Sequence, residues 1–188
     1  MRSIVVPANN SEKPNNHGNW GVLLLVTAGG YLHDESLIRR AKDRWIELMR
    51  SQVAEDGSLP LEICRSDTSD WCGGPTKGIR GIHYTHYTLL PTTIAAEIFR
   101  NLGQDVYSEA GGKQLCKAYA RAAAWSLRPE TFPYFSSNHG RLDLVLDDAN
   151  YFYILQGRCT SAEALLKLPH LNETEADPFR LRAIFKER

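Results

Sequence analysis

The sequence has no excess of charge of either sign, because 22 Lys and Arg residues balance 22 Asp and Glu residues over 188 positions. This neutrality argues against a nucleic-acid-binding protein with a basic surface overall, although a local basic cleft for a polyanion is compatible with it. With 43% hydrophobic and 23% charged residues, the chain has a globular composition, not a disordered or collagenous one. The length predicts a single domain over residues 1–188.

Long apolar runs are also missing. The apolar run over residues 22–26 is far too short to cross a bilayer. Residues 1–7 carry one positive charge but lack the apolar stretch of a signal peptide. We therefore expect no membrane partner, and no signal peptide is visible in this chain.

Cysteines are few. Four cysteines do not suffice for a disulfide scaffold at this length, and no two of them form the CxxC pair typical of structural zinc sites. Cys64 and Cys72 lie in a stretch rich in Gly, Ser and Asp, where a local disulfide and two free thiols are both compatible with the sequence. Cys116 lies in a helical pattern and is interpreted as a small core residue.

Strand patterns are scarce, whereas helical periodicity dominates from Trp20 onwards. Asp34 is expected to cap an amphipathic helix of roughly four to five turns. Further helices are predicted over residues 19–27, 82–101, 112–127 and 142–156, with one or two short helices within 162–167 and 178–186. Pro91 should kink the helix of residues 82–101 or shift its start. Successive amphipathic helices favour an all-α fold of antiparallel hairpins.

A first polar cluster, Asn15-Asn16-His17-Gly18-Asn19-Trp20, falls where a loop turns into a predicted helix. Three amides and an imidazole close to a helix N-terminus form a donor-rich site for a carboxylate. The alternative is that the asparagines simply cap the helix.

A second cluster begins the helix predicted over residues 82–101. Arg80, His83 or Tyr84, and Tyr87 share one helical face, and Arg80 and Tyr87 are separated by about 10 Å along the axis. A guanidinium can bind a carboxylate through two hydrogen bonds, and a phenol near a cation can transfer a proton. The alternative is an aromatic helix start with surface histidines. A zinc site at His83 and His86 has no evident third ligand.

The turn-rich residues 54–78 are too long for a simple connection, and Trp71 favours an ordered loop. The loop mixes charged and aromatic residues, which is typical of sugar binding and also of a solvated loop; these residues are Glu62, Arg65, Asp67, Asp70, Trp71 and Lys77. Asp147 and Asp148 suggest the paired carboxylates of a glycosidase. Adjacent helical residues point about 100° apart, however, which disfavours such a pair.

In combination, these motifs resemble the alginate lyase superfamily, including polysaccharide lyase families five and thirty-eight. The motifs are Asn15-Asn16-His17 followed by Trp20, Asp56-Gly57-Ser58-Leu59-Pro60, and Arg80 with Tyr87 seven residues later. The resemblance covers about residues 13–100 and extends more weakly through residues 129–135. It implies part of an (α/α) toroid, which we expect to be the C-terminal part of a full catalytic domain. It also implies β-elimination of a 1,4-linked polyuronate such as alginate or glucuronan.

The resemblance assigns roles to matching positions. It implies that Tyr87 transfers a proton, that Arg80 binds the substrate carboxylate, and that Asn16 and His17 form the catalytic Asn-His pair. No metal and no organic cofactor is required for this chemistry. The candidates for sugar binding are Trp20, Arg65, Trp71, Lys77, His83, Tyr84 and Tyr134.

The expected partner is an acidic polysaccharide and not a nucleic acid. The resemblance further implies a secreted or periplasmic protein. Two other functions stay open at this point: a non-catalytic remnant that binds polyuronates, and a purely structural helical module.

Overall fold

The computed structural model describes residues 13–144 together with positions 151, 155, 158 and 159. The elements in chain order are α2 (Asn16–Leu32), α3 (Glu35–Gln52), α4 (Pro60–Ile63), α5 (Gly81–Asn101), α6 (Ala110–Leu127) and the 3-10 helix η1 (Pro129–Thr131). The described residues contain no strand, which confirms the all-α prediction. None of the helices in this part of the chain is long and apolar enough to cross a membrane.

The ends of α2 and α3 can be compared with the helix boundaries predicted from the sequence. Asp34 caps α3 as predicted, because its side chain accepts hydrogen bonds from the N–H groups of Ser36 and Leu37. α2 begins three residues before the predicted residue 19, since Asn15 is its N-cap, and it runs past the predicted end at residue 27 to Leu32. The chain leaves α2 through His33, whose φ of 51° lies in the left-handed region.

α5 continues through Pro91 and begins at Gly81, so the proline does not shift its start. The helix predicted over residues 142–156 is wrong at its beginning, because residues 142–144 have no regular secondary structure. Most of the remainder lies outside the described residues, as do Asp147, Asp148 and the helices predicted over 162–167 and 178–186.

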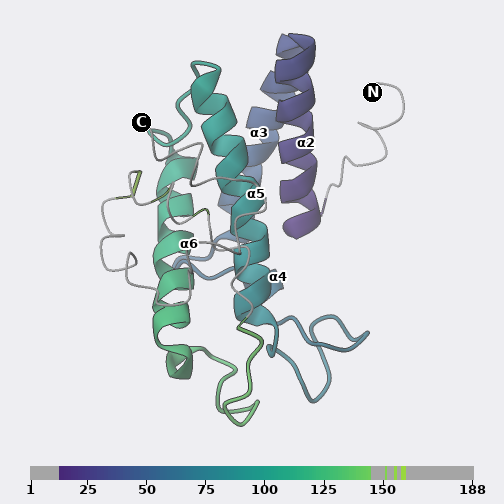
Figure 1. The fold of residues 1–188 in the computed structure, drawn as a ribbon, viewed down its shortest axis with the longest axis vertical. Helices are drawn as coiled ribbons and strands as arrows, with labels where there is room; N and C mark the ends of the chain where they lie inside the picture. The colour runs from purple at the N-terminus through teal and green to yellow at the C-terminus, as the bar shows by residue number, and fades with distance from the viewer. Residues whose placement is uncertain (1–12, 145–150, 152–154, 156–157, 160–188) are drawn as a thin grey trace, which may run out of the picture.

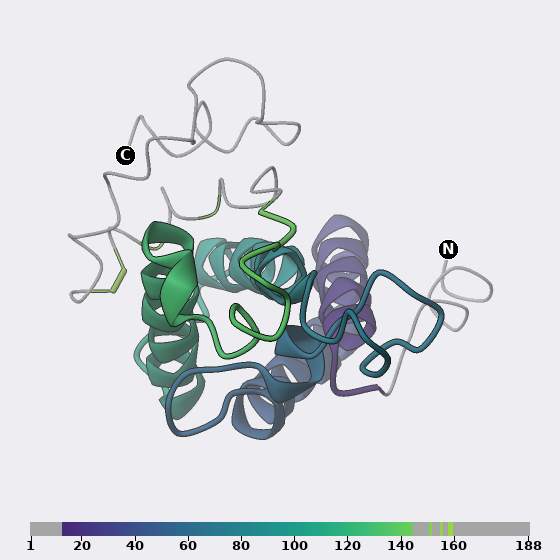
Figure 2. The same ribbon diagram turned by 90° about the horizontal axis from the view of Figure 1, so that it is seen from below.

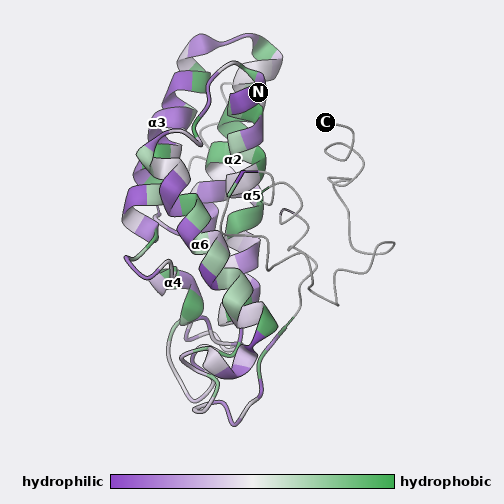
Figure 3. Ribbon diagram, turned by 90° about the vertical axis from the view of Figure 1, so that its left-hand side faces the viewer, coloured by the Kyte–Doolittle hydropathy of each residue, from purple (hydrophilic) through white to green (hydrophobic). Residues whose placement is uncertain are grey.

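The long helices of the described part pack in a ring around one core. α2 contacts α3 and α5, and α6 contacts the same two helices from the other side. The view along the helices in Figure 2 shows this arrangement. α2 is largely apolar, whereas α3 has one polar face (Figure 3). Among the largest fully buried side chains are Leu25, Trp45, Leu48, Phe99 and Tyr119.

A buried hydrogen-bond network fixes α2 against its two neighbours. Asn19 donates to Thr92 Oγ1 on α5 at 2.6 Å and accepts from Gln52 on α3 at 2.8 Å. The indole N–H of Trp45 donates to the carbonyl oxygen of Thr92 at 3.0 Å. Asn19 is therefore neither a cap nor a free donor but the polar centre of the three-helix contact. Its loss would leave buried groups without partners, which is costly.

Two disulfides cross-link the described residues, one in the loop after α4 and one at the core. Cys64 and Cys72 are bonded, so the first of the two alternatives considered for this pair is correct. Cys116 packs against the core, as interpreted from the sequence, and it is also bonded to Cys159, which that interpretation did not include. The two cysteines are 43 residues apart, and helical periodicity around Cys116 contains no information about so distant a partner.

The two disulfides should differ in their effect on stability. A cross-link stabilises mainly by restricting the unfolded chain, and the loop between Cys116 and Cys159 is much longer than the loop between Cys64 and Cys72. Replacing Cys116 and Cys159 by serine should cost about 4 kcal/mol, against about 2.5 kcal/mol for the other pair. Urea unfolding of both double variants measures these values. A larger loss from the Cys64 and Cys72 double variant would contradict this account.

Candidate active site

Most candidate residues gather at the end of the bundle where α2 and α5 begin. The loop of residues 64–80 and the loop of residues 128–144 lie at this end, next to α4 (Figure 1). Arg80 is the N-cap residue of α5, and Asn16 is the first residue of α2. Residues from distant parts of the sequence are thereby placed around one end of α5.

Tyr84 stands between two guanidinium groups. The Cζ atom of Arg65 lies 4.1 Å from the centre of the Tyr84 ring, and that of Arg80 lies 5.2 Å from it. Arg65 also lies 4.9 Å from the ring of Trp71, so it is held between two aromatic faces. Such cation–π contacts orient a guanidinium without neutralising its charge. Arg80 is further oriented by Asp143, whose Oδ2 lies 3.2 Å from its Nε.

Tyr87 is surrounded by aromatic rings from two helices. Its ring centre lies 5.4 Å from that of Trp20 on α2 and 6.1 Å from that of Tyr84. The imidazole of His83 is stacked on it at 6.4 Å. His17 precedes Trp20 by three residues and so lies on the same side of α2. Because Trp20 contacts Tyr87, the start of α2 with its Asn-His pair faces the same end of α5 as Tyr87.

Asn16 is buried and bound to a carboxylate, Glu62, which in the sequence is one of several charged loop residues. Its backbone N–H donates to Glu62 Oε1 at 2.8 Å, and its side-chain amide donates to Glu62 Oε2 at 3.4 Å. Arg65 Nε lies 3.8 Å from the same Oε2. Burial raises the pKa of Glu62 to about 7, although the Asn16 hydrogen bond and the charge of Arg65 act in the opposite direction.

Lys77 and Tyr134 form a second group, which lies on the two long loops. The Nζ atom of Lys77 is 5.6 Å from the ring of Tyr134, and this ring packs against Phe132 with 5.8 Å between centres. Gly78 has a φ of 82°, and a Cβ at this position would collide with the Tyr134 ring. Glycine is therefore required here for both the turn and the close approach of the tyrosine.

His86 is a buried core residue with hydrogen-bond partners at both ring nitrogens. It is fully buried, its Nδ1 lies 2.9 Å from the Tyr151 hydroxyl, and its Nε2 lies 2.7 Å from Ser126 Oγ on α6. Burial lowers its pKa to about 3, so the imidazole is neutral. Both ring nitrogens are already engaged in hydrogen bonds, which agrees with core packing and not with metal binding. The described residues contain no group of three or more potential metal ligands.

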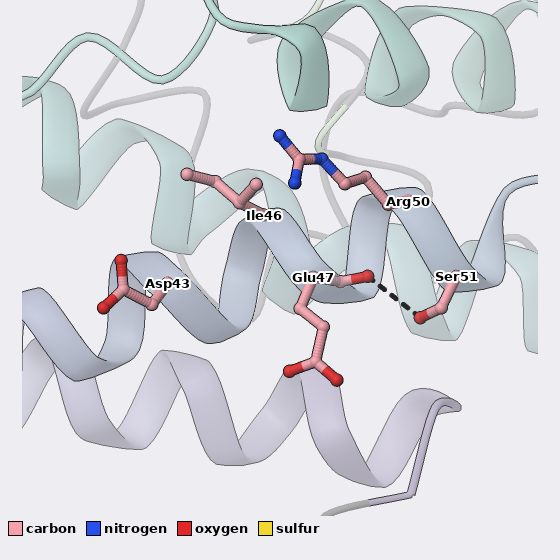
Figure 4. A pocket seen from close by; sticks show the side chains of 5 residues that line it. All are labelled: Asp43, Ile46, Glu47, Arg50 and Ser51. Carbon is pink, nitrogen blue, oxygen red and sulfur yellow. Dashed lines mark hydrogen bonds between the residues drawn. The ribbon is translucent and has the colours of Figure 1, made fainter.

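Two surface pockets differ in their relation to these residues. One of about 460 Å³ includes Arg80 and its partner Asp143, together with Asp67, Ile79, Gly140, Arg141 and Leu142. The other, of about 480 Å³, is formed by residues of α3 alone: Asp43, Ile46, Glu47, Arg50 and Ser51 (Figure 4). None of the predicted site residues lines the second pocket. Of the residues predicted for catalysis or sugar binding, Arg80 lines the first pocket.

Comparison with known proteins shows which family the sequence matches. The sequence profile of the alginate lyase family matches residues 4–132, which include Asn16, His17, Arg80 and Tyr87. The chain belongs to the alginate lyase family. A curated protein of Stenotrophomonas maltophilia (strain K279a), described as a polysaccharide lyase, is 34% identical over 100 residues. The match covers 53% of this chain but only 26% of that relative, so this member of the family spans about a quarter of the relative's length.

Glu62 should make the stability of the fold depend on pH. Its pKa of about 7 lies above that of glutamate in an unfolded chain, so the folded state binds the proton more tightly. This contribution to stability is present below the unfolded pKa and is lost as the pH rises through about 7. From about pH 5 to about pH 8, the free energy of unfolding of Glu62→Gln should gain about 2 kcal/mol relative to the unmodified protein.

Urea unfolding of both proteins across this pH range measures the difference. A difference that stays constant with pH would show that Glu62 has an ordinary pKa.

Proposed function

We propose that this member of the alginate lyase family cleaves a 1,4-linked polyuronate, such as alginate or glucuronan, by β-elimination. The observation that supports the proposal is the contact of Trp20 with Tyr87, because Trp20 follows the Asn-His pair on α2 and Tyr87 follows Arg80 on α5. In this proposal, Asn16, His17 and Arg80 bind the substrate carboxylate, and Tyr87 transfers the proton at the same end of the bundle. The proposed fold of the complete catalytic domain is an (α/α) toroid to which these helices contribute.

The chemistry requires neutralisation of the uronate carboxylate. The proton at C5 is next to this carboxylate, whose negative charge opposes formation of a carbanion. Hydrogen bonds from Asn16, His17 and Arg80 would stabilise the enolate-like transition state as charge moves onto the carboxylate oxygens. Tyr87, as the phenolate, would take the C5 proton. The C4–O4 bond then breaks, a C4–C5 double bond forms, and Tyr87 or His17 returns a proton to the leaving O4.

The partial exposure of the cations supports binding of an anionic chain. The side chains of Arg80 and Asp143 are 36% and 27% exposed, so a uronate carboxylate can approach the guanidinium beside Asp143. Trp71 and Tyr84, which hold Arg65, offer further aromatic surface to a neighbouring sugar ring. Lys77 with Tyr134 would meet a more distant unit of the polymer. An acidic polysaccharide is accordingly the proposed substrate.

The two disulfides support a place of action outside the cytoplasm, since disulfides persist mainly in oxidising compartments. We infer a secreted or periplasmic protein on this ground and from its family.

The test of function is the ultraviolet absorbance of the unsaturated uronate formed by elimination. Purified protein is mixed with alginate or glucuronan, and an increase in absorbance with time supports the lyase. Binding without turnover would identify a polyuronate-binding remnant. Absence of both binding and turnover would leave a structural helical module.

Tyr87→Phe separates proton transfer from packing. The variant keeps the ring that contacts Trp20 but removes the ionisable group, so turnover should fall by at least ~100-fold while polyuronate affinity is retained. Tyr31→Phe is the matched control, because Tyr31 lies near the opposite end of α2 and is 78% exposed. Turnover near that of the unmodified protein in Tyr87→Phe would end the assignment of Tyr87.

Arg80→Ala should behave differently from Tyr87→Phe. It removes a contact to the carboxylate in the bound substrate as well as in the transition state, so affinity and turnover should both fall. Titration with an alginate oligosaccharide and steady-state kinetics measure the two effects. Unchanged affinity would show that Arg80 does not bind the substrate carboxylate.

A further inference from the structure

We propose that Glu62 is a positioning residue of the lyase site, which orients the Asn16 amide and the Arg65 guanidinium toward the uronate. The inference rests on the proposed function. It assigns a role to a carboxylate that neither the motif pattern nor the proposed chemistry had used.

The contacts of Glu62 go beyond those of a helix cap. A residue that only caps α2 needs one oxygen for the N–H of Asn16, and Glu62 Oε1 accepts this bond at 2.8 Å. The second oxygen accepts from the side-chain amide of Asn16 at 3.4 Å. One carboxylate thus holds both the backbone and the side chain of Asn16. An amide has two N–H groups in one plane, so the contact of one of them with Glu62 also fixes the direction of the other.

The same oxygen links this amide to a cation. Arg65 Nε lies 3.8 Å from Glu62 Oε2, and the guanidinium is further held between Tyr84 and Trp71. In its ionised form Glu62 would repel a uronate, and the charge of Arg65 offsets this repulsion. Glu62 is 1% exposed, so the substrate does not contact it directly. Its effect on the substrate would therefore pass through the groups that it contacts, Asn16 and Arg65 among them.

The local fold explains why Glu62 can reach Asn16. Pro60 begins the short helix α4, and Glu62 is its third residue, between the core residue Leu59 and the disulfide at Cys64. The backbone around Glu62 is thereby held on both sides. A carboxylate on so restrained a segment can orient its partners without a large loss of conformational entropy on substrate binding.

The test is a double-mutant cycle on kcat/KM with alginate or glucuronan. Glu62→Gln places an amide nitrogen opposite the Asn16 amide, so kcat/KM should fall at least ~10-fold. In an Asn16→Ala background the same change should cost less than ~3-fold, because the group that Glu62 orients is already gone. Equal fold-losses in both backgrounds would overturn the proposal, because the effect of Glu62 would then not pass through the Asn16 side chain.

Glu97→Gln is the matched control. Glu97 is also buried and paired with an arginine, Arg158, but it lies ten residues after Tyr87 on α5, about 15 Å along the axis. It should show no coupling to Asn16→Ala, and coupling as large as that of Glu62→Gln would overturn the proposal. Circular dichroism and thermal unfolding verify the folded fraction of each variant. If Glu62→Gln does not fold, Glu62→Asp, which is too short for both contacts, takes its place in the cycle.

Failure of the proposed function is distinguishable from failure of this inference. If the unmodified chain has no turnover, the lyase proposal fails, and the cycle is measured on affinity for an alginate oligosaccharide. Loss of affinity in Glu62→Gln that disappears in the Asn16→Ala background supports the positioning role. Equal losses, or no binding by any variant, would overturn it.

Discussion

The hydrogen bond between Asn19 and Thr92 sets the register of α2 on α5, and the arrangement of the candidate site depends on that register. Both groups are buried, and a shift of either helix by one turn would leave them without partners. Trp20 follows Asn19 directly, so the same register brings its ring onto Tyr87. Asn16 lies one turn earlier and reaches Glu62. A polar contact in the core therefore decides which groups meet at the end of the bundle.

The site is composite, and each part is held by a different kind of interaction. The start of α2 is fixed by its caps, and the start of α5 follows from helix packing. The Cys64–Cys72 disulfide closes the loop that contains Arg65 and Trp71. The guanidinium groups lie against aromatic faces, which restrict their motion while leaving their charge available to an anion. This combination provides preorganised positive charge in a chain of zero net charge.

Local signals in the sequence predicted the helices well, and long-range contacts could not be read from it. Asp34 and the amphipathic pattern behind it were sufficient to predict α3, because capping and helical periodicity involve residues within a few turns. Asn19 looked like a cap or a ligand donor, and only the packing of three helices shows it to be a core residue. Glu62 and Cys116 have partners 46 and 43 residues away, to which no spacing rule points. The family resemblance identified Asn16, His17, Arg80 and Tyr87 as a group, whereas their chemical roles are proposals.

The most direct test of the central claim, that these residues form one uronate-binding site, is a crystal structure of Tyr87→Phe with a saturated alginate oligosaccharide. The account predicts a uronate carboxylate within hydrogen-bonding distance of Arg80 and of the Asn16 and His17 side chains, with C5 facing the ring at position 87. An oligosaccharide bound elsewhere, for instance in the pocket on α3, with Arg80 still paired only to Asp143, would contradict it.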